Sequence, residues 1–335
     1  MTKRRLSQRQ QTRIVEKQQR EIVGAPGADT SATPINKCNG RVISHFGQQL
    51  DVEALPVDAT QAPVRCFQRA NLPALVTGDL VVWEAGEANT GVIVAAAKRS
   101  SVFGRPAFDG NFKPMAANID QVLVIIAPLP EPFMNLIDRY LAAIEALGLN
   151  AALVLNKCDL TTELAQFDLD KMLSLYEACG YAVYRVSALD GSGFDRLQQS
   201  LRGQTTVLVG QSGVGKSSLI NRLGRGDEAL VGALSEAKAK GTHTTTTAKL
   251  FHLPELDLID SPGIREFSLG HITPAQLFDG FREFRQYAGH CKFRDCKHRT
   301  EPGCAILAAV ARGEIAQQRL DSYFQILQTI GGGSE

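Results

Sequence analysis

The sequence has few aromatic residues and no excess of charge of either sign. Only 7% of its 335 residues are Phe, Trp or Tyr, and a single Trp is present. The 36 Lys and Arg residues nearly balance the 35 Asp and Glu residues, so the net charge of the chain does not indicate a nucleic-acid-binding protein. Any surface for a polyanion must therefore come from local clusters of charge.

The sequence also lacks an apolar stretch long enough to cross a membrane and the apolar core of a secretory signal. We therefore expect a soluble, cytoplasmic protein without a membrane partner, and a monomer. The seven cysteines are an odd number, and three of them are clustered late in the chain. This distribution argues against a disulfide framework and favours a metal site. With 44% apolar residues, the chain is long enough for two or three domains.

Residues 1–36 differ in composition from the rest of the chain. Up to residue 23, seven Lys or Arg residues stand against only Glu16 and Glu21, with glutamines between them, and a stretch rich in Gly, Ala and Pro comes next. Two interpretations remain open for this segment. It is either a flexible tail that only aids solubility or a basic arm that folds on RNA.

Residues 37–113 predict short strands with no helix between them. Stretches rich in β-branched and aromatic residues lie at 40–44, 64–67, 79–84 and 90–94, and Gly, Pro and Asn separate them. A segment of about 75 residues suits a small antiparallel barrel of five strands, the oligonucleotide-binding (OB) fold. The barrel either only packs against its neighbours or binds nucleic acid through its basic residues, which are Arg41, Arg65, Arg69, Lys98, Arg99 and Arg105.

From residue 114 to 268 the pattern changes to strands that alternate with helices. Continuous apolar runs at 122–126 and 151–155 predict strands buried on both faces, and helical spacing of apolar residues covers 133–147 and 169–178. Three more strands are predicted at 182–186, 206–209 and 256–259. This alternation predicts a parallel sheet, in which ligands bind beyond the carboxyl ends of the strands.

A glycine-rich loop with the pattern G-x-x-x-x-G-K-[ST] follows one of these strands and precedes a predicted helix. Glycine lets successive backbone N–H groups point at phosphate oxygens, and the helix N-terminus adds partial positive charge. Lys216 would reach the β- and γ-phosphates, and Ser217 would ligate Mg²⁺. The alternative is a glycine turn without a ligand. The predicted phosphate loop consists of Gly210, Gln211, Ser212, Gly213, Val214, Gly215, Lys216, Ser217 and Ser218.

The strand at 151–155 ends in Asn156-Lys157-Cys158-Asp159, which matches the guanine pattern N-K-x-D. The Asp159 carboxylate can accept hydrogen bonds from the N1–H and amino groups of guanine. Adenine does not offer these donors, and a buried polar group left unpaired costs about 1–3 kcal/mol. Lys157 would pack along the base, and Asn156 would connect loops. Ser187 and Ala188 would form a second loop at the base edge, although this dipeptide carries no signal by itself.

Two further segments carry groups that would surround the γ-phosphate. Asp260-Ser261-Pro262-Gly263 fits D-x-x-G, in which Asp260 would hold Mg²⁺ through water and the Gly263 N–H would contact the γ-phosphate. The threonine-rich segment 241–247 would bring the Thr245 hydroxyl to Mg²⁺, or is merely a solvated loop. Ile264 follows D-x-x-G and cannot position water as a glutamine would, so we predict slow intrinsic turnover.

The order of these motifs is unusual. Ordinary small GTPases begin with the phosphate loop, whereas here N-K-x-D and Ser-Ala precede it, and residues 191–204 would join the former ends of the domain. In this order and in the flanking domains the chain resembles the circularly permuted GTPases, and among them the group that depends on the small ribosomal subunit. The resemblance implies GTP and GDP as ligands, hydrolysis stimulated by that subunit, and a role in its late maturation with contacts to its rRNA and to other assembly factors.

The resemblance also draws attention to His243. Members of the family commonly carry Gly-Arg-His-Thr-Thr-Thr in this segment, and the chain has Thr242 in the arginine position but keeps the histidine. His243 would orient the attacking water once a partner orders the segment, or it only contacts RNA or packs. Together with Lys216 it is the residue that we expect to act in catalysis.

Residues 269–335 predict helices, at 305–311 and 317–330, beside a cluster of metal-binding residue types. Cys291, Cys296, His298 and Cys304 give the pattern C-x₄-C-x-H-x₅-C. Three thiolates and one imidazole suit tetrahedral Zn²⁺, and four protein ligands leave no open position, so the site would be structural. The alternative is unligated core cysteines. His298 is preferred to the adjacent His290 on the resemblance. The loop would also contact RNA phosphates through Lys292, Arg294, Lys297 and Arg299.

The sequence thus predicts a multidomain protein with a basic tail (1–36), an OB-fold barrel (37–113), a circularly permuted α/β P-loop GTPase domain (114–268) and a helical zinc-binding domain (269–335). One alternative is an RNA-binding scaffold that binds GTP and barely hydrolyses it. Another alternative, a kinase that acts on a metabolite, would need an acceptor site, and no residue of the sequence indicates one.

We expect the loss of the γ-phosphate to move the zinc-binding domain, because that domain follows D-x-x-G directly. Three other histidines are expected to be ordinary surface or packing residues: His45, His252 and His271.

Overall fold

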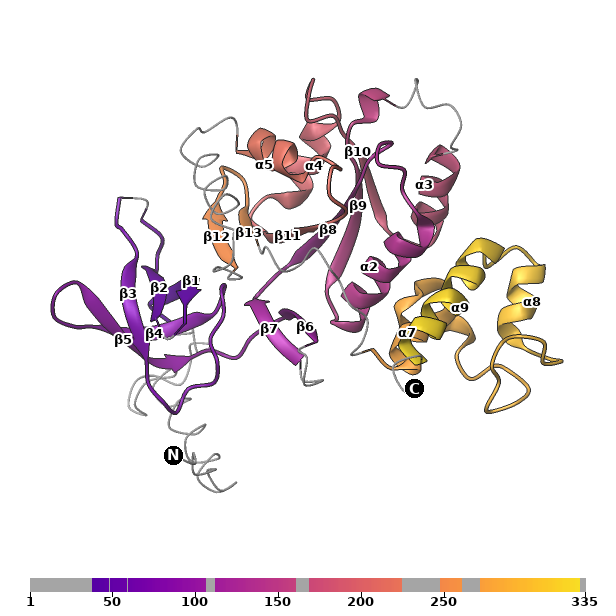
Figure 1. Cartoon of the computed structure of the whole chain (residues 1–335), viewed down its shortest axis with the longest axis horizontal. Helices are drawn as coiled ribbons and strands as arrows, with labels where there is room; N and C mark the ends of the chain where they lie inside the picture. The colour runs from indigo at the N-terminus through magenta and orange to yellow at the C-terminus, as the bar shows by residue number, and fades with distance from the viewer. Residues whose placement is uncertain are drawn as a thin grey trace, which may run out of the picture.

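A computed structural model of the chain describes residues 38–47, 49–58, 60–106, 112–160, 169–224, 248–260 and 272–331. Three parts follow one another across the molecule: a barrel, a central sheet covered by helices on both faces, and a helical module (Figure 1). The basic tail, the threonine-rich segment 241–247 and the last three residues of D-x-x-G (261–263) lie outside the described residues, and with them His243, Thr245 and Gly263.

The barrel consists of β1 (Gly40–Phe46), β2 (Gln49–Ala54), β3 (Val64–Gln68), β4 (Leu80–Ala85) and β5 (Thr90–Ala96). The strands pair in the order β1-β2-β3-β5-β4, and β1 also pairs with β4, which closes the barrel. The expected five-stranded barrel is confirmed, but β3 and β5 are parallel. A ring with an odd number of strands cannot alternate direction all the way around, so at least one pair must be parallel.

The structure contains one barrel strand, β2, that was not among the strands predicted from the sequence. Its apolar residues Leu50 and Val52 are buried and alternate with Asp51 and Glu53, which is the period of a half-buried strand. Strands β6 (Val102–Pro106) and β7 (Phe112–Ala117) were also not predicted, and they form a separate two-stranded sheet beyond the barrel.

The central sheet has the strand order β10-β9-β8-β11-β13-β12. Its strands are β8 (Gln121–Ile126), β9 (Asn150–Leu155), β10 (Ala182–Arg185), β11 (Thr205–Val209), β12 (Lys249–His252) and β13 (Asp257–Asp260). All neighbours are parallel except β12 and β13, which form an antiparallel hairpin. The predicted parallel sheet is confirmed, and the short strand β12 is an addition to it.

Helices cover both faces of the central sheet. Consecutive strand residues point to opposite faces, and in β8 they are all apolar after Gln121, so both faces need to be buried. Val122 and Val124 of β8 share a core with α2 (Met134–Ala146) and α3 (Leu169–Ala178). Leu123 and Ile125 share the opposite core with α4 (Phe194–Leu201) and α5 (Lys216–Leu223). A short 3₁₀ helix, η1 (Cys158–Leu160), follows β9.

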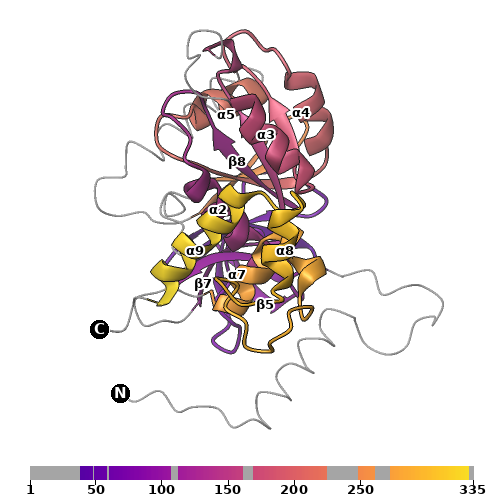
Figure 2. The ribbon, with the colours of Figure 1, turned by 90° about the vertical axis from the view of Figure 1, so that its right-hand side faces the viewer.

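The helical module contains α7 (Pro274–Gly280), the 3₁₀ helix η3 (Arg282–Tyr287), α8 (Ala305–Ala311) and α9 (Gln317–Gly331). It packs on α2, and Figure 2 shows this packing from the side of the module. A Cβ at Gly280 would lie 2.9 Å from the Cα of Ala142, so glycine permits the close approach of α7 to α2. Among the described helices, none combines the length and apolar character needed to cross a lipid bilayer.

Candidate functional site

The predicted phosphate loop connects β11 to α5 at the carboxyl edge of the central sheet. Gly210, Gly213 and Gly215 have φ angles of +144°, +85° and +89°, which L side chains rarely adopt. A Cβ at Gly210 would collide with the carbonyl oxygen of Ile125, and one at Gly215 with the side-chain amide of Asn156. The loop is therefore a backbone cradle at a helix N-terminus, an arrangement in which backbone N–H groups can bind phosphate oxygens.

Lys216 is the first residue of α5 and reaches back over this loop. Its Nζ donates hydrogen bonds to the carbonyl oxygens of Gly210, at 2.6 Å, and Gln211, at 2.5 Å. The ammonium group thus lies over the start of the cradle, where it can bind phosphate oxygens. The next two residues, Ser217 and Ser218, are exposed at the same helix end.

Asn156 connects three loops at the edge of the sheet. The residue is only 1% exposed, and its Nδ2 donates to the carbonyl oxygen of Val214 at 3.0 Å. Its Oδ1 accepts from the backbone N–H of Ala188 at 3.2 Å. The buried Ser187 closes the second loop, since its Oγ accepts from the N–H of Leu189 at 3.2 Å.

Lys157 ties the predicted guanine loop to the phosphate loop a second time. Its Nζ donates to the carbonyl oxygens of Gly213, at 2.7 Å, and Leu129, at 3.0 Å. Its backbone has φ of +58°, an uncommon value for a residue other than glycine. The Asp159 side chain is exposed beside it in η1. Residues far apart in the chain thus line one continuous rim.

Asp260 is the last residue of β13, and β13 neighbours β11 in the sheet. Both strands are parallel, so Asp260 and the phosphate loop lie at the same edge. The linker to the helical module, residues 261–271, is outside the described part of the chain. Movement of that module on loss of the γ-phosphate therefore stays a prediction.

The four predicted metal ligands come together in the helical module. The ligand atoms of Cys291, Cys296, His298 and Cys304 all lie within 4.8 Å of one another. The sulfurs of Cys291 and Cys304 are 3.9 Å apart, and Nδ1 of His298 lies 3.5 and 3.4 Å from them. Around a tetrahedral Zn²⁺ these separations would be about 3.8 Å and about 3.5 Å. The cluster can hold a metal ion, and His290 is not part of it.

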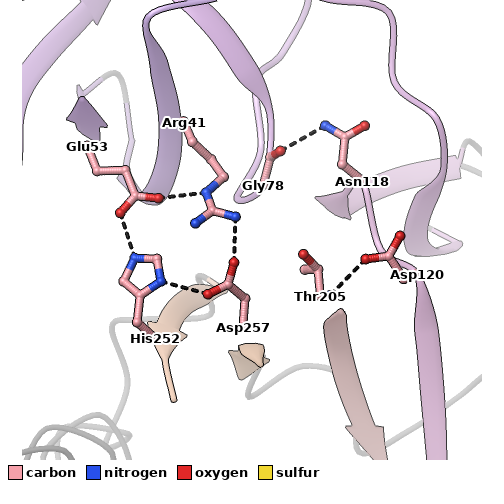
Figure 3. A network of polar contacts seen from close by, with 8 residues as sticks. All are labelled: Arg41, Glu53, Gly78, Asn118, Asp120, Thr205, His252 and Asp257. Carbon is pink, nitrogen blue, oxygen red and sulfur yellow. Dashed lines mark hydrogen bonds and ion pairs between the residues drawn. The ribbon is translucent and has the colours of Figure 1, made fainter. Parts of the chain in front are cut away.

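A ring of four charged side chains joins the barrel to the β12–β13 hairpin, and the sequence did not predict it (Figure 3). Arg41 of β1 donates to Glu53 of β2 at 2.6 Å and to Asp257 of β13 at 2.7 Å. The two ring nitrogens of His252 lie 2.6 Å from oxygens of these same two carboxylates. His252 is therefore more than an ordinary surface residue. We call Arg41, Glu53, His252 and Asp257 the four-residue ring.

Comparison with known protein families gives a match to the RsgA GTPase family over residues 96–270. The small ribosomal subunit biogenesis GTPase RsgA of Azotobacter vinelandii is 50% identical over 338 residues, which cover 98% of each chain. The chain belongs to the RsgA GTPase family. A second RsgA of the same description, from Pseudomonas fluorescens, is 49% identical over 342 residues and 100% of each chain.

Two crystal structures support the arrangement of the RsgA fold. YloQ, described as a circularly permuted GTPase, is 26% identical with a TM-score of 0.68 over 87% of this chain and 94% of its own. YjeQ from Thermotoga maritima is 29% identical with a TM-score of 0.66, over 88% and 98% of the two chains. The family, the permuted motif order and the fold expected from the sequence are thereby confirmed.

Proposed function

We propose that this RsgA-family protein hydrolyses GTP, slowly alone and faster on the small ribosomal subunit, and that it assists late maturation of that subunit in the cytoplasm. The observation that carries the proposal is the pair of side chains that join the guanine loop to the phosphate cradle. Asn156 and Lys157 both donate to backbone carbonyls of the loop between β11 and α5. One guanine nucleotide can therefore contact both loops.

Each side chain has a defined task in this proposal. Asp159 accepts two hydrogen bonds from the guanine edge, next to the loop of Ser187 and Ala188. Lys216 and the backbone N–H groups of the cradle bind the β- and γ-phosphates. Ser217 and Asp260 would bind at the γ-phosphate end of the site, and the same is proposed for Thr245 and Gly263. Mg²⁺ bound by Ser217 and Asp260 would supply positive charge to the phosphate oxygens.

Hydrolysis needs a positioned water, and the chain has Ile264 where many GTPases have glutamine. We propose that His243 orients this water after the ribosomal subunit has ordered its segment. The helical module would hold one structural Zn²⁺ through its three thiolates and one imidazole, because four protein ligands close the coordination shell. We further propose contacts with rRNA and a monomeric state.

Base recognition can be tested by reversing the hydrogen-bond pattern at position 159. The variant Asp159→Asn should lose GTP turnover about 10- to 100-fold, as expected for one or two unpaired buried groups. It should gain activity with xanthosine triphosphate, whose C2 carbonyl accepts from an amide. The matched control Asp195→Asn, an exposed carboxylate at the start of α4, should behave as the wild type. Unchanged preference for GTP in Asp159→Asn would exclude this binding mode.

The competing proposal, an RNA-binding scaffold that keeps GTP as a bound ligand, predicts no multiple turnover. Phosphate release should be measured with added small and large ribosomal subunits. We expect acceleration by small subunits alone, and its loss in Lys216→Ala. Full stimulated turnover in His243→Ala would leave the GTPase proposal intact but remove the water-orienting role.

A further inference from the structure

The β12–β13 hairpin connects the barrel to the aspartate predicted to hold Mg²⁺. The two strands pair over their full length, with Lys249 opposite Asp260 at one end and His252 opposite Asp257 at the other. The barrel contacts this hairpin at both ends. The position of Asp260 thus depends on a hairpin that the barrel holds.

At the Asp260 end, β1 of the barrel continues the central sheet. Ser44 is the register partner of Lys249, so a single strand separates β1 from Asp260. The fully buried Thr77 donates its hydroxyl to the carbonyl oxygen of Ala248 at 2.7 Å. A buried hydrogen bond to the backbone fixes the position of the strand, because losing it leaves a polar group without a partner.

At the other end, the four-residue ring links β1 and β2 of the barrel to both strands of the hairpin. Two members belong to the barrel and two to the hairpin, and each carboxylate contacts both cations. Both nitrogens of His252 face carboxylate oxygens, so both must carry protons. Hydrogen bonds to Asp257 and then to Glu53 raise the pKa of His252 to about 9, which keeps the imidazolium charged at neutral pH.

We propose that the barrel positions Asp260 through this hairpin and that the members of the four-residue ring are positioning residues for GTP hydrolysis. The inference rests on the proposed function, in which Asp260 takes part in binding Mg²⁺. Anything that shifts β1 and β2, such as a ligand on the barrel, moves the same hairpin. Binding of a ligand to the barrel and binding of Mg²⁺ at Asp260 are therefore coupled, and such coupling between two binding equilibria is reciprocal.

The test compares two variants, each of which removes one arginine that pairs with a carboxylate of the hairpin. Arg41→Gln opens the four-residue ring. Arg202→Gln is the matched control, because Arg202 follows α4 and pairs at 2.9 Å with Glu255 in the turn of the same hairpin, which is not a member of the four-residue ring. Arg41→Gln should raise the Mg²⁺ concentration for half-maximal GTP hydrolysis about fivefold, the lower end of typical coupling between sites. Arg202→Gln should leave it unchanged.

A second measurement needs no catalysis. Hydrogen exchange of the backbone amides in β13, without nucleotide or Mg²⁺, should accelerate about fivefold in Arg41→Gln only. Trp83, the single Trp, lies in β4 and reports by its fluorescence whether the barrel stays folded. Should Arg41→Gln unfold the barrel, His252→Gln opens the ring from the hairpin side instead.

The two measurements separate the inference from the proposed function. Equal Mg²⁺ dependence and equal exchange in the ring variant and the Arg202→Gln control would overturn the positioning role. A wild-type protein that does not hydrolyse GTP would overturn the proposed function and with it the role of the ring in hydrolysis. Hydrogen exchange in β13 would still decide whether the barrel positions Asp260.

Discussion

The central domain is joined to its two neighbours by the same kinds of charged group in different surroundings. On the barrel side, the four-residue ring is partly open to water, and the side chain of His252 is 42% exposed. On the side of the helical module, Arg319 of α9 is 1% exposed and pairs with the fully buried Asp138 of α2 and with Glu283 of η3. The same kind of pairing is thus screened by water on one side and shielded from it on the other.

Apolar packing strengthens this difference. The Arg319 guanidinium lies over the rings of Phe281, at 4.4 Å, and Tyr176, at 5.4 Å, and the Tyr176 hydroxyl donates to Asp138 at 2.7 Å. Burial opposes the charge of Arg319, but the carboxylates of Asp138 and Glu283 outweigh it and raise its pKa. A buried network thus holds the module on α2, whereas the ion pairs between the barrel and the hairpin remain partly accessible to water.

Removing the metal should have the largest effect on local stability. The experiment also shows whether attachment of the helical module to α2 depends on the metal. Structural Zn²⁺ contributes about 10–16 kcal/mol of apparent binding free energy in small modules. A strong chelator should therefore unfold the loop between Cys291 and Cys304 while the amides of α9 stay protected. Hydrogen exchange before and after chelation measures both. Loss of protection in α9 as well would mean that the Arg319 network alone does not hold the module.

Breaking the buried network around Arg319 should have the second-largest effect. Arg319→Met should lower the free energy of unfolding by about 3–5 kcal/mol, because it leaves the Asp138 carboxylate buried without its cation. Urea unfolding followed by circular dichroism measures the change. The control is Arg312→Gln, which removes the exposed pair with Glu314 and should leave the transition in place. A loss as small as in this control would show that the buried network contributes little to stability.

High salt should weaken the barrel contact selectively. In 1 M NaCl the Debye length falls to about 3 Å, which screens exposed charges far more than buried ones. Exchange of the amides in β12 should accelerate with salt, and exchange in α9 should not. Equal responses in the two regions would show that the two interfaces differ less than their burial indicates.

The smallest expected effect is a pH dependence confined to the barrel side. The pKa of His252 is raised from 6.5 to about 9, so its stabilisation is fully present below pH 6.5 and is lost as the pH rises toward 9. Protection of the β12 amides, corrected for intrinsic exchange, should fall across this range in the wild type. His252→Gln should show a flat profile.

The sequence predicted the parts of the molecule that have a local signature. Continuous apolar runs marked β8 and β9, and the cysteine spacing marked a cluster that the fold does assemble. Strand β12 was missed because four residues, two of them polar, carry too short a pattern. The four-residue ring could not have been predicted, since its members are up to 216 residues apart and no pattern links Arg41 to Asp257. The buried pair of Asp138 and Arg319 escaped prediction for the same reason.

The pairing of β1 with β12 has a consequence for synthesis of the protein. The barrel strands are complete at Ala96, but their partner in the central sheet begins at Lys249. At about 5–20 residues per second, the translating ribosome takes roughly 8 to 30 seconds to add the residues between them. Throughout that interval one end of β1 is an open strand edge on the nascent chain, available to any other strand nearby. Because the permuted motif order places β12 late in the chain, the exposed edge of β1 can pair with strands of other nascent copies for a longer time.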